Sequence, residues 1–200
     1  MRTKNPDPPT RNKLLDAAQE VMLSKGYVAA SVDEICAAAG VTKGSFFHYF
    51  KNKEELGKVL LQRFTETQTA HFTAACGEVA DPFDRVLCLI DCAIESIRNP
   101  EMKGCLVGTF AQEIWETHPE LRQVCQCSFE GFASSVSRDL VEAKSLHAPD
   151  GDFDAAGLGS TFLAVIQGSM LIFKTDQNRE SIERNLLHYK NYLQMLYGRS

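Results

Sequence analysis

The sequence lacks almost any run in which apolar and polar residues alternate with period two. Such alternation is typical of half-buried strands, so its absence argues against a β-sheet protein. Apolar residues recur instead at spacings of three and four, and they make up 44% of the 200 residues. This pattern predicts an all-α fold with a sizeable core.

The amino terminus also lacks the apolar segment of a secretory signal, because Met1 is followed by a polar run broken by prolines up to Pro9. We therefore expect a cytoplasmic protein. The seven cysteines are odd in number and irregularly spaced. In a reducing compartment this favours free thiols over a disulfide framework.

No set of residues has the spacing of a catalytic or metal site. Cys105, His118 and the carboxylates show no arrangement typical of a nucleophile, a base and an orienting group, so we expect no enzyme and no catalytic residue. Cys88 and Cys92 are four apart and share a helix face, but the sequence assures no third and fourth ligand. We predict no metal and no cofactor, with a metal sensor as an alternative.

Residues 155–173 carry no formal charge, and their length is close to the roughly 20 residues of a membrane span. Gly157, Gly159 and Gly168 lie among several hydroxyl and amide side chains there. That composition favours a helix buried on most sides over a membrane helix.

The net charge of -5 would ordinarily argue against a nucleic-acid partner, because duplex DNA repels an acidic protein. The charge is uneven, however. Residues 1–60 hold nine Lys/Arg and seven Asp/Glu, a net of +2, and the other residues carry -7. The basic part of the chain is thus small and N-terminal.

Capping signals divide the chain into helices. Ser31 and Glu34 have the spacing of a capping box, and Gly40 is a typical stop signal. Thr10 and Thr42 are expected caps of the first and third helices. The expected helices cover about residues 10–25, 31–40, 43–50, 52–76, 82–99, 104–117, 119–146 and 155–173, followed by a last one with apolar residues at heptad spacing.

Residues 31–50 combine a capped helix, a turn of small residues and a short helix rich in hydroxyl, basic and aromatic side chains. Small residues let two helices cross closely, and glycine permits a left-handed turn. Polar side chains near the start of the second helix can reach base edges. The pattern favours a helix-turn-helix, although a polar helical hairpin without a ligand would share it.

The run Ser31-Val-Asp-Glu-Ile-Cys-Ala-Ala-Ala-Gly-Val-Thr-Lys-Gly-Ser-Phe-Phe-His-Tyr-Phe-Lys-Asn-Lys-Glu-Glu-Leu56 resembles the DNA-binding signature of the TetR/AcrR family. The likeness covers about residues 11–60. It implies an N-terminal three-helix helix-turn-helix domain at residues 1–56 and a C-terminal helical bundle for ligand binding and dimerisation at residues 57–200.

The implied function is a transcriptional repressor that binds a palindromic operator in double-stranded DNA as a homodimer. A small apolar or electrophilic inducer would release it. The alternative for the whole chain is a helical ligand-binding protein that does not bind DNA.

The resemblance also implies which side chains contact DNA. Gly44 would let the third helix approach the groove, and Phe47 stands where the family commonly has Tyr, which puts one phosphate contact in doubt. Phe46 and Phe50 are better interpreted as core residues. The expected DNA-binding residues are Ser31, Thr42, Lys43, Gly44, Ser45, Phe47, His48, Tyr49 and Lys53.

The segment from Met102 to Glu113 resembles a subgroup of this family in which a Gly-Cys-Leu run opens the sixth helix. Some members of that subgroup sense electrophiles or oxidants through the cysteine. A thiol at a helix N-terminus beside Lys103 is expected to react readily, so Cys105 is a possible sensor thiol. The alternative is a small packing residue.

The last two helices are expected to form the dimer interface with a second copy. Glycines would permit close approach of the partner helices, and the heptad stripe would supply apolar area. Intramolecular packing alone is the alternative. The residues assigned to this interface are Gly157, Gly168, Ile182, Leu186, Tyr189 and Leu193.

Overall fold

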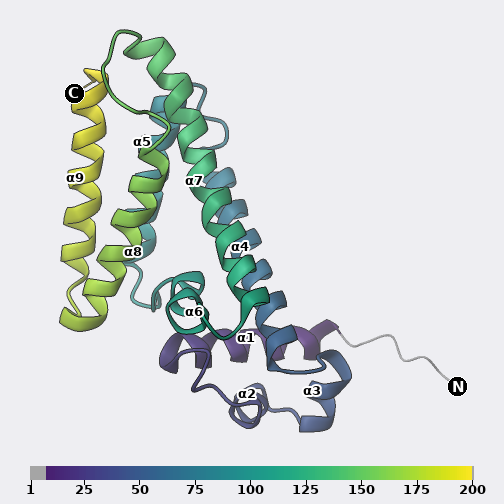
Figure 1. The fold of residues 1–200 in the computed structure, drawn as a ribbon. Helices are drawn as coiled ribbons and strands as arrows, with labels where there is room; N and C mark the ends of the chain where they lie inside the picture. The colour runs from purple at the N-terminus through teal and green to yellow at the C-terminus, as the bar shows by residue number, and fades with distance from the viewer. Residues whose placement is uncertain (1–7, 200) are drawn as a thin grey trace, which may run out of the picture. The chain divides into compact units, whose positions relative to one another are not determined.

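A computed structural model of the protein describes residues 8–199, and every regular element in that range is a helix (Figure 1). The prediction of an all-α fold is confirmed. The described helices are α1 (Pro8–Lys25), α2 (Val32–Ala39), α3 (Lys43–Tyr49), α4 (Lys53–Cys76), α5 (Pro82–Arg98), α6 (Leu106–Ile114), α7 (Pro119–His147), α8 (Leu158–Asp176) and α9 (Arg179–Tyr197).

Side-chain caps set most of these boundaries. Before α2, the Ser31 Oγ accepts from the Glu34 N–H at 3.2 Å, and the Glu34 carboxylate accepts from the Ser31 N–H at 3.0 Å. This is the predicted capping box, which satisfies two backbone donors that the first helical turn leaves unpaired. Gly40 ends α2 in the left-handed region at φ 65°. The predicted cap Thr42 is confirmed as well. The Asp81 side chain caps α5 in the same way.

Two helices have bounds that differ from the prediction. α1 begins at Pro8, so Thr10 lies inside the helix and does not cap it. Proline is tolerated in a first turn, whose N–H groups have no intrahelical partner. α6 begins only at Leu106 because Gly104 has a φ of 128°, which no helix contains. It ends at Ile114, earlier than predicted.

The described residues form two compact units that do not follow chain order. The first unit holds the residues up to Glu66 together with Lys103–Gln126, and the second holds Thr67–Met102 and residues 127–199. α6 therefore belongs to the same unit as α1, α2 and α3. The domain boundary between residues 56 and 57 stays a prediction, and residues 1–7 of the predicted N-terminal domain lie outside the described range.

Each unit has its own apolar core. In the first unit, Phe46 and Phe50 are buried as predicted, with 0% and 2% of their surface exposed. In the second unit, the core comes from α5, α7, α8 and α9. Two buried tyrosine hydroxyls donate to backbone carbonyls there, Tyr189 to Leu158 and Tyr197 to Leu140, each at 2.7 Å. Buried phenols need such partners to offset the loss of water.

The apolar stripe of α9 lies in this core and not on the outside. Ile182, Leu186 and Leu193 are fully buried, and Tyr189 is 4% exposed. Their assignment to the dimer interface was wrong, because the stripe packs within its own chain. Heptad spacing predicts that a face is covered, but it does not say by which helix.

α8 is the one described helix that is long and apolar enough, by length and composition, to cross a membrane. The expectation that it is buried on most sides was wrong, since only 28% of its most apolar window is buried. Phe162 and Phe173 lie in the core, whereas Leu171 and Ile172 are about half exposed. α8 thus has one covered face and one apolar face that the described chain leaves open.

Candidate nucleic-acid interface

α2, the turn at Gly40 and α3 form the predicted helix-turn-helix. The Thr42 Oγ1 accepts from the Ser45 N–H at 3.2 Å and lies 3.1 Å from the Ser45 hydroxyl, so both hydroxyls help to start α3. Phe46 and Phe50 anchor the helix in the core. The opposite side of α3 stays exposed, and it presents Lys43, Gly44, Phe47 and His48. This is the placement that a recognition helix requires.

The basic group on this surface has an acidic neighbour. The Lys43 ammonium lies 2.7 Å from the Asp33 carboxylate of α2, and the two side chains are 60% and 65% exposed. Such an exposed ion pair is worth only about 0.2–1 kcal/mol, so Lys43 can exchange this partner for another acceptor. Phe47 is 56% exposed, and its ring is available to an apolar contact.

Gly44 has no steric reason within the chain to be a glycine. A Cβ built on it would meet only the Thr42 hydroxyl, at the ordinary contact distance of 3.7 Å. Glycine inside a helix costs about 0.5–1 kcal/mol relative to alanine. No contact within the described fold offsets this cost in stability, whereas close approach of α3 to another molecule would.

Ser31 is less available to a phosphate than the sequence indicated. Its hydroxyl donates to the Glu34 carboxylate at 2.9 Å. Hydrogen bonds from Lys25 and from the Ser31 backbone and hydroxyl lower the pKa of Glu34 to about 2. Glu34 is therefore ionised beside Ser31 at neutral pH, and a carboxylate there repels phosphate.

Lys53 is held by the protein itself. Its ammonium donates to the backbone carbonyls of Tyr27, Val28 and Ala30, at 2.9, 3.2 and 2.8 Å. It also lies 4.5 Å from the centre of the Tyr27 ring. An ammonium has three N–H donors, and all three are used here. Lys53 therefore does not offer the free ammonium that the phosphate role requires, and burial lowers its pKa.

The loop that Lys53 holds is fixed from α6 as well. The Glu113 carboxylate accepts from the Val28 N–H at 2.8 Å. Gly26, at φ 90°, lies so close to that carboxylate that a Cβ would collide with it. No pattern in the sequence predicts this contact, because Glu113 is 85 residues from Val28.

Cys105 is the N-cap of α6. Its Sγ accepts from the Gly108 N–H at 3.5 Å, and the residue is partly exposed. Lys103, which was expected to favour the thiolate, forms an ion pair with Glu20 of α1. Cys105 thus occupies the predicted helix start, and the segment before it is attached to α1.

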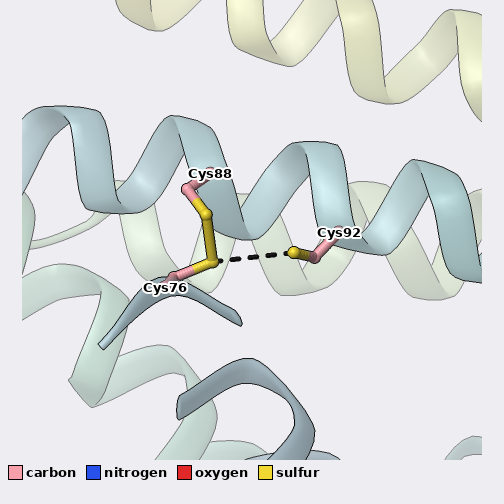
Figure 2. Close-up of side chains that lie close together, drawn as sticks. All are labelled: Cys76, Cys88 and Cys92. Atoms are coloured by element: carbon pink, nitrogen blue, oxygen red, sulfur yellow. Dashed lines mark hydrogen bonds between the residues drawn. A yellow bond between two sulfur atoms is a disulfide. The ribbon is translucent and has the colours of Figure 1, made fainter. Parts of the chain in front are cut away.

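A disulfide joins Cys76 at the end of α4 to Cys88 of α5, so the prediction that all cysteines are free was wrong (Figure 2). Cys92, one turn further along α5, lies with its Sγ 3.6 Å from that of Cys76. The sequence identified Cys88 and Cys92 as sharing a face. It missed Cys76, which only the turn between α4 and α5 brings to them.

Comparisons with known proteins agree with this geometry. Residues 14–58 match a family model described as "Bacterial regulatory proteins, tetR family", and residues 82–185 match "Transcriptional regulator LmrA/YxaF-like, C-terminal domain". Both models describe regulators, and together they cover the helix-turn-helix and most of the second unit.

Among curated relatives, the repressor DhaR of Mycobacterium sp. (strain GP1) is 29% identical over 178 residues, which is 89% of each chain. The transcriptional regulator AcuR of Cereibacter sphaeroides is 30% identical over 167 residues, or 82% of this chain and 75% of the relative. A crystal structure of a regulatory protein TetR from Rhodobacter sphaeroides has a TM-score of 0.81 at 26% identity, and the match covers 91% and 97% of the two chains.

We predict that Lys53→Met lowers the free energy of unfolding by about 1–3 kcal/mol, because three carbonyls lose a charged donor. Lys51→Met is the matched control: Lys51 is exposed and two residues away, and its loss is expected to change stability by no more than about 0.5 kcal/mol. Urea unfolding followed by circular dichroism measures both. Equal effects of the two substitutions would contradict the structural role of Lys53.

Proposed function

Because the chain belongs to the TetR family of bacterial regulatory proteins, we propose that it is a cytoplasmic repressor that binds a near-palindromic operator as a homodimer and leaves it when an inducer binds. Its relatives are transcriptional regulators, so the chain is a DNA-binding regulator and not an enzyme. The homodimer, the inducer and the individual DNA contacts are the parts that we propose.

The exposed side of α3 is the observation that supports the DNA contacts most directly. Lys43 can donate to guanine O6 and N7, and Phe47 can contact a thymine methyl group. Gly44 lets the helix axis come close to the groove. Thr42 and Ser45 contact bases or nearby phosphates from the first turn, and His48 and Tyr49 contact the DNA backbone. Ser31 and Lys53 carry little of the binding in this proposal, because internal partners hold both.

The homodimer is supported by the apolar side chains that α8 and α9 leave exposed. On α8, Leu171 and Ile172 are 50% and 49% exposed, and a Cβ on Gly168 would meet open space. On α9, Leu187, Tyr192 and Met195 are 40%, 47% and 82% exposed. Exposed apolar side chains concentrated on two helices are typical of a partner surface.

We assign this surface to a second copy of the chain. A dimer presents two recognition helices to successive major grooves, about 34–36 Å apart. Gly157, also assigned to the interface, has a reason within its own chain to be a glycine, because a Cβ there would collide with the Asp154 side chain.

The inducer response is proposed to reach DNA through α6. α6 lies in the same unit as the helix-turn-helix, and Glu113 holds the loop that precedes α2. A ligand that moves α6 would shift this loop and the position of α2. A difference in ligand affinity of about 1–3 kcal/mol between the two states changes DNA binding roughly 5- to 150-fold.

A thiol-based response through Cys105 is the second candidate, and the N-cap geometry favours it. Addition of the Cys105 thiolate to a quinone forms a C–S bond, and the displaced electron pair goes to the carbonyl oxygen, which takes up a proton. The bulky thioether no longer caps α6 as the free thiol does. The attached Lys103 and Glu113 would pass this change on to α1 and to the loop before α2.

We predict that Gly44→Ala weakens binding to the DNA upstream of the protein's own gene about tenfold or more, because a methyl group enters the space between helix and groove. The same change should leave stability unaltered or raise it by up to about 1 kcal/mol. Fluorescence anisotropy at several salt concentrations and thermal unfolding measure the two effects.

Gly131→Ala is the matched control for this experiment. Gly131 also lies within a helix, α7, with open space around a Cβ. We expect a similar gain in stability and no change in DNA affinity. Unchanged DNA binding by Gly44→Ala would contradict the placement of α3 in the groove.

We predict that Leu187→Glu weakens self-association about tenfold or more, because the interface would bury an unpaired carboxylate. Val141→Glu, a change at a similarly exposed residue of α7, is expected to leave the dimer intact. Light scattering coupled to size exclusion over a dilution series measures the mass. If wild type is monomeric at every concentration, or if both variants behave alike, the proposed interface is wrong.

We predict that p-benzoquinone releases the wild type and the Cys127→Ser variant from DNA but leaves Cys105→Ser bound. Serine is itself a good N-cap, so Cys105→Ser should fold and bind DNA normally. Cys127 is exposed and serves as the control thiol. Release of Cys105→Ser at the wild-type quinone concentration would exclude the thiol response and leave the DNA-binding proposal untouched.

A further inference from the structure

Three cysteine sulfurs come together in the second unit, whereas the helix-turn-helix belongs to the first. Cys76 is the last residue of α4, and Cys88 and Cys92 lie one turn apart on α5 (Figure 2). Their Sγ atoms all lie within 4.8 Å of one another. We call these three residues the cysteine cluster.

The spacing of the cysteine cluster fits a thiolate-bound cation. Zinc–sulfur bonds are about 2.3 Å long, so two thiolates on one tetrahedral ion stand about 3.8 Å apart. The Sγ atoms of Cys76 and Cys92 are already 3.6 Å apart. Once the disulfide between Cys76 and Cys88 is reduced, small side-chain rotations bring the third sulfur to the same separation.

Packing does not explain the cysteine cluster. The core face of α5 is formed by other residues, among them Val86 and Ile90, which are at most 1% exposed. Cys88 and Cys92 are only partly buried, so an ion can reach them from solvent. Cys76, in contrast, is 3% exposed and fixes the inner side of the cluster.

We propose that the reduced cysteine cluster is a binding site for a thiophilic divalent cation of the Zn²⁺ class, held by the thiolates of Cys76, Cys88 and Cys92. Among the described residues no further Cys, His, Asp or Glu joins the group. The fourth position of a tetrahedral ion is therefore open to water or to an exchangeable ligand. Thiolates select borderline and soft ions over Mg²⁺ and Ca²⁺.

The redox state of the cluster controls this site. A cellular dithiol reduces the disulfide in a two-electron exchange: it becomes a disulfide itself, and its two protons end on Cys76 and Cys88. Binding of the cation then releases the three thiol protons and forms three metal–sulfur bonds. Because the disulfide and the bound cation need the same sulfurs, they exclude each other.

The test is a titration of the full chain with Co²⁺ alone, after reduction with a phosphine under nitrogen. We expect about one equivalent to bind with thiolate-to-cobalt charge-transfer absorption, and Zn²⁺ to displace it. Cys92→Ser should lose about a third of the absorption per bound ion and bind about tenfold more weakly or worse, since one of three ligands is gone.

Cys127→Ser is the matched control, because Cys127 is an exposed cysteine of α7 outside the cluster, and it should titrate as wild type does. Circular dichroism verifies that each variant is folded. Within the cluster, Cys92 is the residue whose substitution is least expected to disturb the fold, because it is partly exposed and outside the disulfide. The oxidised protein should bind no Co²⁺ at the cluster. If the reduced wild type shows no more charge-transfer absorption than Cys92→Ser, the cysteine cluster is no cation site.

Discussion

The ammonium of Lys53 is the contact on which the arrangement of the helix-turn-helix depends. It donates hydrogen bonds to the backbone carbonyls of Tyr27, Val28 and Ala30, which belong to the loop between α1 and α2. That loop sets the position of Ser31, the N-cap of α2, and the capping box then fixes the start of the helix. The carboxylate of Glu113, on α6, accepts a hydrogen bond from the Val28 N–H of the same loop. A cation and an anion from two other helices thus hold this loop, in addition to the burial of Tyr27 and Ala30 in the core.

α4 is restrained by side-chain chemistry at both ends. Its first residue, Lys53, holds the loop before α2, and its last residue, Cys76, is bonded to α5. The two ends belong to different compact units, so α4 is a continuous covalent and hydrogen-bonded connection between them.

What could be predicted from the sequence was local. The capping box at Ser31, the stop at Gly40 and the cap at Thr42 each involve residues a few positions apart, and all three are confirmed. The burial of Phe46 and Phe50 followed from helical spacing in the same way. Such features depend on a short stretch of backbone, which the sequence specifies directly.

What could not be predicted depends on a partner far along the chain. The resemblance in sequence predicts that Lys53 contacts a DNA phosphate. Only the position of the loop before α2 shows that backbone carbonyls of this loop already accept its hydrogen bonds. The apolar stripe of α9, which includes Leu186, has the same sequence pattern whether helices of its own chain or of a second copy cover it. Cys76 joins Cys88 only because the chain turns back between α4 and α5.

The ion pair between Lys43 and Asp33 has a consequence for how a regulator finds its site among the many competing sequences of a chromosome. The Asp33 carboxylate repels the phosphates of any DNA sequence alike. It therefore weakens non-specific binding to duplex DNA and shortens the residence time at non-specific sites. In the proposed complex, a guanine would offer Lys43 two acceptors in place of the Asp33 carboxylate, whereas a base without these acceptors would not. A nearby negative charge thereby widens the gap between correct and incorrect sequences while it lowers total affinity.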